Sequence, residues 1–208
     1  MRKIEVPVFI VGAGPTWLAA TCLLATLGTQ TLTITRYADT ANSPRAHIVN
    51  QRTMEVMRDL GIEDRMLKVA TPWPLMRNNV WATSFAGTEI ARLEAWGNAP
   101  ERRADYERAS PSGMCNLPQH LMEPVLADVA RERGAELAFS TELLSVRQSA
   151  DAVHSICRDR GTGEEFEVVS AYAIGADGDN GPVAKELDFQ LEGRMAWAMR
   201  STSGSKPT

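Results

Sequence analysis

The start of the chain alternates apolar runs with glycine in a pattern that predicts a strand, a helix and a second strand. Val6–Val11 is short, apolar and β-branched, which indicates a buried strand that runs into Gly12. The small and aliphatic residues of Thr16–Leu27 predict a buried helix, with Gly28 in the position of a C-terminal cap. Thr31–Thr35 alternates threonine with leucine and isoleucine and predicts the second strand. The two strands of such a βαβ unit are expected to be parallel.

The following part of the chain indicates a loop, a short helix and a separate group of strands. Ala41–Asn50 contains several helix and strand breakers, and Thr53–Leu60 predicts a short helix with its apolar residues on one side. Between Trp73 and Trp96, two early prolines precede short aromatic and β-branched pieces. These pieces predict strands of a different sheet, so residues 73–105 are a candidate for a second domain inserted here.

The second half of the chain predicts one long helix and a meander of strands. Apolar residues recur at helical spacing in Asn116–Arg133, with Pro124 inside the helix and Gly134 at its end. A further buried strand, Tyr172–Ile174, leads into Gly175–Gly178. Before it come three short strand candidates, which predict a three-stranded meander: Leu143–Val146, Val153–Cys157 and Phe166–Val169.

Composition and charge exclude several classes of protein. The 208 residues are 44% hydrophobic and 23% charged, as in globular proteins, and the net charge of -4 argues against a nucleic-acid binder. The cysteines and histidines are scattered without metal-ligand spacing, so we expect no metal site. Met1–Lys3 and the apolar stretch behind it mimic a signal peptide, but Gly12–Pro15 interrupts the apolar run. We expect no membrane segment and a cytoplasmic location.

The turn between the first strand and helix carries candidate nucleotide chemistry. A dinucleotide fold needs glycine first for the tight turn and again for close approach to the diphosphate, and Gly12 and Gly14 meet these demands before Pro15. Trp17 stands where a third glycine normally lets the helix touch the strand. A merely structural turn is the alternative. At the end of the second strand, Arg36 stands near the place of a ribose-binding carboxylate; a solvated strand-end charge is equally compatible.

Several longer segments make the chain similar to a known family. It resembles the phenol hydroxylase branch of the class A flavoprotein monooxygenases from about Val6 to Gly193. The segments that carry the resemblance are Ser43–His47, Asn50–Glu55, Asn78–Gly87, Leu117–Leu121 and Gly175–Gly178. Their order and spacing together are more specific than any one of them. The resemblance implies an α/β fold: a Rossmann-like FAD-binding domain with a parallel sheet and a β-meander over residues 1–193, and only the start of a substrate domain.

The resemblance also implies cofactors, a reaction and residue roles. It implies bound FAD, NADPH or NADH as reductant, and ortho-hydroxylation of a phenol or chlorophenol with O2. Carried over by motif, Gly12 and Gly14, with Pro15, hold the diphosphate of the cofactor. Arg45 approaches flavin or nicotinamide phosphates, because a guanidinium suits phosphate geometry. Gln119 matches a glutamine that contacts the cofactor.

Two more positions follow from the same resemblance. Asp177, together with Gly178, belongs to the Asp-Gly motif of the cofactor site. His47 stands where related phenol hydroxylases place a group that helps to deprotonate the phenol, and histidine titrates near neutrality. A loop histidine bonded to backbone or water is the alternative.

The chain also departs from the family pattern. Trp17 is expected to crowd the helix against the first strand, and Asn180–Pro182 replaces the serine and basic residues that normally follow the Asp-Gly motif. Residues 194–208 match nothing expected of the family, and their composition predicts disorder. One lost nucleotide after the codon for Met195 is a hypothesis for this tail, since a shifted frame can be back-translated into a family-like continuation.

Three functional hypotheses remain open at this point. The first is a phenol hydroxylase that is truncated and inactive alone, the second a non-catalytic remnant that binds FAD weakly or not at all, and the third a nicotinamide-only oxidoreductase. The Asp-Gly motif disfavours the third. Apolar surface left uncovered by missing parts, around Trp73, Trp81 and Phe85, is expected to promote self-association.

Overall fold

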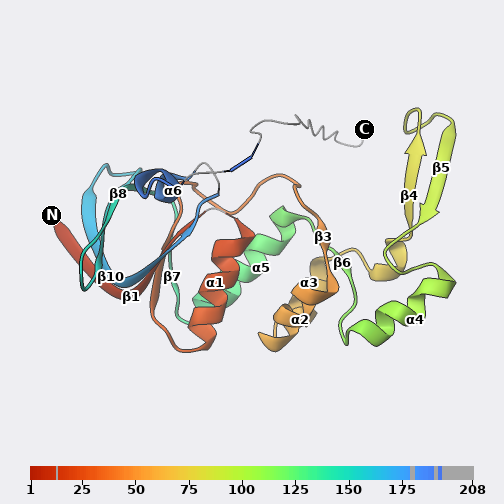
Figure 1. Cartoon of the computed structure of the whole chain (residues 1–208), viewed down its shortest axis with the longest axis horizontal. Coiled ribbons are helices and arrows are strands. Elements are labelled where there is room, and N and C mark those ends of the chain that lie inside the picture. Colours follow the sequence, from red (N-terminus) through yellow and green to blue (C-terminus); the bar gives the residue numbers. More distant parts are fainter. Residues whose placement is uncertain (13, 179–180, 190–191, 194–208) are drawn as a thin grey trace.

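The computed structural model describes residues 1–12, 14–178, 181–189 and 192–193. It has a large sheet at one end, helices beside it, and a hairpin with a further helix at the other end (Figure 1). The expected disorder of residues 194–208 falls outside the described residues.

Six strands form one sheet in the order β7-β2-β1-β10-β9-β8. The first four are parallel to one another, and β9 and β8 continue the sheet in antiparallel fashion. The predicted βαβ unit and the predicted meander are therefore both present, in a Rossmann-like arrangement. The strands are β1 (Arg2–Gly12), β2 (Thr31–Ile34), β7 (Glu136–Ala138), β8 (Thr141–Gln148), β9 (Val153–Asp159) and β10 (Glu165–Ala176).

The second half of β1 is buried on both faces of the sheet, and it is accordingly apolar at successive positions. Side chains of a strand alternate between faces, so Val8 and Ile10 enter the core beneath the helices. Phe9 and Val11 enter a second core, which they share with residues of β2 and the meander. A continuous apolar run is the pattern expected of a parallel strand covered on both sides.

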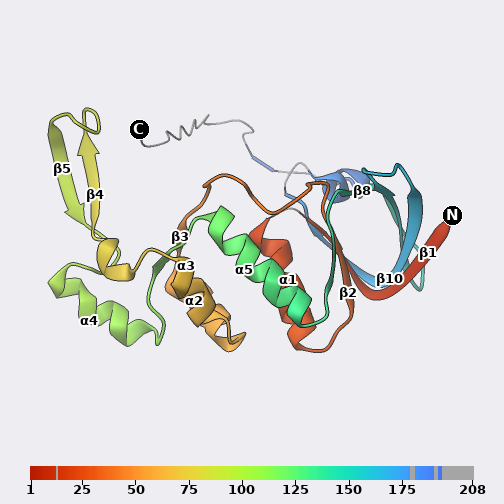
Figure 2. The same ribbon diagram turned by 180° about the vertical axis from the view of Figure 1, so that it is seen from behind.

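Four helices supply the other half of the first core. They are α1 (Pro15–Thr26), α2 (Gln51–Asp59), α3 (Glu63–Val69) and α5 (Gln119–Glu132). α1 and α5 lie side by side against the sheet in both views (Figures 1 and 2). α2 begins two residues before the predicted start, because the side chain of Asn50 accepts a hydrogen bond from the Thr53 amide at 2.9 Å and caps the helix.

The remaining elements lie away from the six-stranded sheet (Figure 2). A two-stranded hairpin of β4 (Asn78–Ala82) and β5 (Glu89–Glu94) forms a sheet of its own, as predicted for this region. Its assignment to a substrate domain stays a prediction. Near it are η1 (Trp73–Leu75), α4 (Pro100–Ala109) and a two-stranded sheet of β3 (Ile48–Val49) and β6 (Cys115–Asn116).

The expectation that Trp73 belongs to an uncovered apolar surface was wrong. Its indole N–H donates to the carbonyl oxygen of Trp96 at 2.7 Å, and its ring lies 6.2 Å from that of Tyr106. Trp81 and Phe85, by contrast, are exposed on the hairpin. Of the three aromatic residues expected at this surface, only the two on the hairpin are therefore uncovered.

The prediction of two separate strands between Phe166 and Ile174 was also wrong. β10 is a single strand whose pairing with β1 runs from Phe166 to Ala176. Tyr172, expected to be buried, is 72% exposed. The reason is that β9 pairs with β10 only as far as Ser170, so the last residues of β10 have no strand on that side.

Candidate functional site

The turn from β1 into α1 presents backbone amides that have no partner within the helix. Gly14 is the N-cap of α1, with extended backbone angles (φ -150, ψ -173), and no side chain of the described residues caps the helix. Pro15 occupies the first turn and has no N–H, so the amides that follow it are the free donors of the helix end. Together with the positive end of the helix dipole, they favour a negatively charged group at this point.

Gly12 is required by the packing of Trp17 rather than by an unusual backbone angle. A Cβ atom at Gly12 would lie 2.5 Å from the Cβ of Trp17 and 2.8 Å from the carbonyl oxygen of Ala176. Trp17 itself is only 1% exposed and meets Phe139 edge to face at 6.1 Å. The indole therefore points into the core and packs closely against β1, as expected for a side chain of this size. It does not occupy the space at the N-terminus of α1.

That space is a cavity of about 540 Å³. Its walls come from four parts of the chain: the α1 N-terminus, the segment between β2 and β3, the start of α5 and the end of β10 with the two residues after it. The lining residues are Gly14, Thr16, 37–42, Arg45, Gln119 and 176–178. Five positions predicted from sequence thus meet in one cavity: Gly14, Arg45, Gln119, Asp177 and Gly178.

The pairing of β1 with β10 explains why the glycine turn and the Asp-Gly motif meet. Gly12 is the register partner of Ala176, so Asp177 follows directly beside the turn. One carboxylate oxygen of Asp177 accepts the Val183 amide at 2.9 Å, at the start of α6 (Pro182–Glu186). This bond fixes the side chain of a residue that lines the cavity.

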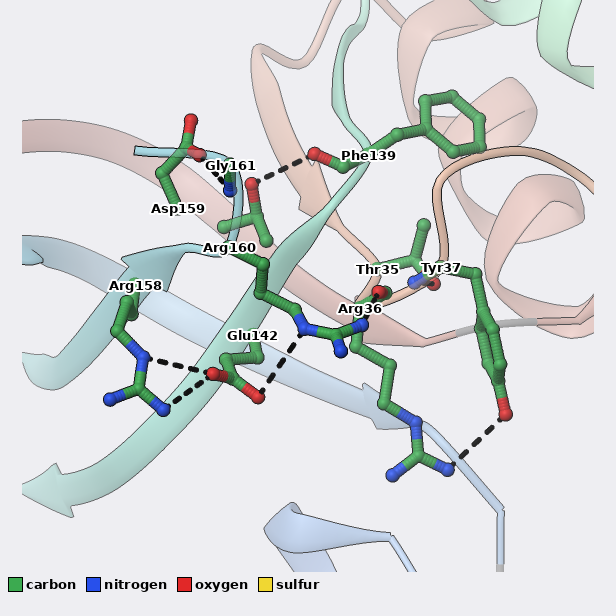
Figure 3. A network of polar contacts seen from close by, with 10 residues as sticks. Thr35, Arg36, Tyr37, Phe139, Glu142, Arg158, Asp159, Arg160 and Gly161 are labelled. Carbon is green, nitrogen blue, oxygen red and sulfur yellow. Dashed lines mark hydrogen bonds and ion pairs between the residues drawn. The ribbon is translucent and has the colours of Figure 1, made fainter. Parts of the chain in front are cut away.

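A smaller cavity of about 250 Å³ adjoins the first and shares Tyr37 and Asp177 with it. Arg36 and Lys185 line it, together with the start of β8. Figure 3 shows Arg36 turned toward Tyr37, whose hydroxyl is 3.2 Å from a guanidinium nitrogen. The position predicted for the ribose side of a nucleotide is therefore next to the main cavity rather than inside it.

A salt-bridge network supports this second cavity (Figure 3). Glu142 accepts from Arg158 at 2.6 and 2.9 Å, and Arg160 donates to the carbonyl oxygen of Arg36 at 2.6 Å. Asp159 holds the turn that presents Arg160, and backbone hydrogen bonds from Thr162 and Gly161 lower the pKa of its carboxyl. Residues of the meander thereby fix the backbone after β2.

His47 is not brought into the cavity. It is exposed beside β3, with its Nδ1 atom 3.0 Å from the side-chain oxygen of Asn116. Its carbonyl oxygen accepts the Leu117 amide at 2.7 Å, so the backbone of this residue joins the loop to the segment before α5. The role of His47 as a base stays a prediction.

Glu123, which the sequence patterns did not single out, lies behind the cavity wall and is hydrogen-bonded to two of its lining residues. It lies on the buried face of α5 and is 1% exposed. Its two oxygens accept hydrogen bonds from the side-chain nitrogen of Gln119 at 2.5 Å and from the Ala41 amide at 2.6 Å. The available signal was a charged residue at an apolar position of the helical pattern, one turn after a predicted site residue.

A family model described as the FAD binding domain matches residues 5–205. The chain belongs to this family. The match covers the whole of the six-stranded sheet except the start of β1, and extends past residue 193, where we expected the resemblance to end. FAD is thus the cofactor of the family to which this FAD-binding domain belongs.

Curated relatives with similar sequences are aromatic monooxygenases. The FAD-binding domain is 47% identical to 2,4-dichlorophenol 6-monooxygenase of Delftia acidovorans over 92% of its own length and 33% of the relative. It is 49% identical to the protein of that name from Cupriavidus pinatubonensis, over 92% and 32%. Phenol 2-monooxygenase of a Pseudomonas strain is 47% identical over 88% and 30%. The chain therefore spans about a third of the length of these relatives.

Solved structures agree with this assignment. The flavin-dependent monooxygenase PieE, in complex with FAD and substrate, superposes with a TM-score of 0.91 at 46% identity, over 95% of this chain and 34% of the other. A ternary complex of aklavinone-11 hydroxylase with FAD and aklavinone gives a TM-score of 0.79 at 29% identity, over 90% and 36%. The FAD-binding domain thus shares its fold with proteins whose structures contain FAD.

Two other kinds of feature are absent from the described residues. In that part of the chain, no helix combines the length and apolarity needed to cross a membrane. Nor do three or more histidine, cysteine or acidic side chains gather there as a metal site would require. The three cysteines, Cys22, Cys115 and Cys157, are buried and free.

Proposed function

We propose that this chain forms the FAD-binding part of a monooxygenase that hydroxylates a phenol or chlorophenol with O2 and NADPH or NADH. The observation that carries the proposal is the cavity of about 540 Å³ at the N-terminus of α1, where residues from four parts of the chain meet. Similar proteins are named as dichlorophenol and phenol monooxygenases, which supports a phenolic substrate. A related structure contains FAD, which supports FAD as the cofactor.

The residues present fit a flavin dinucleotide. The open face of Gly14 and the free amides of α1 suit a diphosphate, because a Cβ at Gly14 would meet no described atom closer than 4.0 Å. Arg45, exposed at the rim, supplies a guanidinium for phosphate oxygens. The smaller cavity beside Arg36 and Tyr37 suits the adenosine end. Bound flavin would supply the oxygen chemistry, while these protein groups hold and orient it.

We expect the 208-residue chain to bind FAD but not to hydroxylate phenol. The chain covers only about a third of the length of these curated relatives. We therefore propose that it lacks most of the residues that would form the walls of a substrate pocket. A non-catalytic FAD-binding or inert remnant is the alternative function that this observation favours. We further propose a cytoplasmic location, which three free cysteines support.

Flavin stoichiometry of the purified chain tests the proposal. We expect a yellow protein, or a colourless one that takes up added FAD with one site per chain. Arg45→Ala should weaken FAD binding about tenfold, since a charge-assisted contact to phosphate is lost. Arg52→Ala is the matched control, because Arg52 is exposed and pairs with Glu55 outside the cavity. A chain that neither carries nor takes up FAD would favour the inert remnant.

A further inference from the structure

The segment directly after β2 is held to the meander through three successive carbonyl oxygens. The outer two, those of Thr35 and Tyr37, accept at 2.9 and 2.8 Å from backbone amides at and just before the start of β8. The middle one, that of Arg36, accepts at 2.6 Å from the side chain of Arg160. All three residues line the cavity of about 250 Å³, and Tyr37 lines the larger cavity as well. One side chain of the meander thus completes the attachment of a segment that both cavities share.

The peptide group between Arg36 and Tyr37 depends on Arg160 more than its neighbours do. Its carbonyl oxygen is the acceptor for Arg160, while its N–H points to the Thr35 hydroxyl at 3.4 Å, which is long for such a bond. The peptide groups before and after it keep their bonds to the backbone of the meander. Loss of the Arg160 side chain therefore leaves the segment attached but frees this one peptide group to rotate.

A rotation there would displace a pair of side chains at the smaller cavity. The guanidinium carbon of Arg36 lies 5.2 Å from the centre of the Tyr37 ring, and one of its nitrogens lies 3.2 Å from the Tyr37 hydroxyl. Rotating the intervening peptide group changes one backbone dihedral angle of each residue, so the two side chains cannot both keep their places. The geometry of the Arg36–Tyr37 pair is thus linked to Arg160.

Arg160 is itself fixed, although it lines neither of the two cavities. Figure 3 shows its guanidinium between the Glu142 carboxylate, 4.0 Å away, and the backbone of Arg36. Its amide donates to the carbonyl oxygen of Ser140 at 2.8 Å, and Asp159 accepts two backbone amides of the turn that follows. Arg160 is therefore placed to act on a ligand through Arg36 and Tyr37 rather than by contact.

We propose that Arg160 is a positioning residue that holds the Arg36–Tyr37 pair in place for the adenosine half of FAD. The inference rests on the proposed function, in which the smaller cavity takes the adenosine end. An aromatic ring and a guanidinium both offer faces on which a planar base can stack, so their relative placement affects its binding. The diphosphate, in contrast, is assigned to the α1 amides, which Arg160 does not touch.

Arg160→Ala tests this role, because the side chain is about half exposed and its removal should leave the fold intact. We expect the Kd for FAD, measured by flavin fluorescence, to rise about fivefold, the effect of one lost hydrogen bond. ADP contains the adenosine and the diphosphate without the flavin, so its Kd, measured by calorimetry, should rise by the same factor. The urea midpoint of the ligand-free chain should stay close to the wild-type value.

A double-mutant cycle distinguishes positioning from a general loosening of the chain. If Arg160 acts through the Arg36–Tyr37 pair, its replacement should change the FAD affinity less than about twofold in the background of Arg36→Ala. Arg160→Lys is the conservative variant, since an ammonium group can also donate to the Arg36 carbonyl oxygen. We expect Arg160→Lys to bind FAD within about twofold of wild type.

The matched control is Arg147→Ala, which removes the same charge from an exposed position of β8 that lines neither cavity. Long-range attraction of an anionic dinucleotide alone would make Arg147→Ala and Arg160→Ala equally weak binders. Positioning predicts wild-type affinity for Arg147→Ala. Equal weakening by the two variants, an undiminished effect of Arg160→Ala beside Arg36→Ala, or unchanged ADP affinity overturns the inference.

Two further outcomes separate this inference from the proposed function. A wild-type chain that takes up no FAD overturns the proposed function and the inference with it, whereas wild-type binding with unchanged Arg160→Ala affinity overturns the inference alone. If Arg160→Ala fails to fold, Arg160→Met decides, because it keeps an aliphatic stem for packing and has no donor. The methionine variant should show the same loss of FAD affinity, and wild-type affinity for it would contradict the role of Arg160.

Discussion

Alanine at Gly12 and alanine at Gly14 should have different consequences, although both glycines belong to one motif. At Gly12 the added Cβ would lie 2.5 Å from the Cβ of Trp17 and 2.8 Å from the Ala176 carbonyl oxygen. Carbon atoms in contact are normally about 3.5–4.0 Å apart, so α1 must move by about 1 Å. Such overpacking costs about 1–3 kcal/mol, offset by about 0.4–1 kcal/mol from the stiffer unfolded chain. We expect Gly12→Ala to lower the free energy of unfolding by about 2 kcal/mol.

Gly14→Ala should leave the fold intact and weaken the ligand site. The added Cβ would meet nothing closer than the Gln119 side-chain nitrogen at 4.0 Å, and the backbone angles of Gly14 are open to alanine. The weaker N-cap and the stiffer unfolded chain nearly cancel, so the free energy of unfolding should change by less than about 0.5 kcal/mol. The methyl group projects where the diphosphate would approach the α1 amides, and FAD affinity should fall at least about tenfold.

Urea unfolding and FAD titration on the two variants and wild type measure both quantities. With a slope of about 2 kcal/mol per molar urea, the midpoint of Gly12→Ala should shift by about 1 M and that of Gly14→Ala hardly at all. A wild-type midpoint for Gly12→Ala would refute the packing argument. Wild-type FAD affinity for Gly14→Ala would refute the placement of the diphosphate.

Three further predictions concern the core, the thiols and the hairpin. Trp17→Ala should lower the free energy of unfolding, measured in urea, by about 3–5 kcal/mol. Trp17→Phe should lower it by much less, because the buried indole N–H has no hydrogen-bond partner among the described atoms and its removal costs little. Equal losses for the two variants would contradict this reasoning. Burial raises the thiol pKa to about 11 for Cys22, about 11 for Cys115 and about 12 for Cys157, so a thiol reagent at about pH 8 should modify these cysteines only after unfolding. Rapid labelling of the folded chain would contradict the burial of the three thiols. Replacing exposed Trp81 and Phe85 by serine should reduce the self-association that gel filtration measures. A monomeric wild-type chain would contradict the prediction.

Local sequence patterns predicted those elements of the fold whose conformation depends on contacts between residues close in sequence. The run Val6–Val11, the glycine turn and the helix after it form a unit with short contacts in sequence, and the structure has all three. β10 was misjudged because its exposed end depends on where β9 stops, which is a property of another strand. Nothing within Tyr172 and its neighbours carries that information.

The candidate site shows the same division. Motifs identified Gly14, Arg45 and Gln119, and the structure gathers them around one cavity. Glu123 and Tyr37 were not predicted, because they join the site through contacts with other segments: Glu123 with the Ala41 amide, and the Tyr37 carbonyl oxygen with the Ser140 amide just before β8. Residues that act through another side chain leave a weak trace in sequence, since their own pattern is that of a helix or a loop.

The pairing of Gly12 with Ala176 has a consequence for how the protein is made. Gly12 is synthesised long before Ala176, because the two residues lie far apart in the sequence. Until β10 has left the ribosome, the glycine turn lacks the strand that pairs with β1 and brings Asp177 beside it. During that interval β1 presents an unpaired edge, which favours association with other chains.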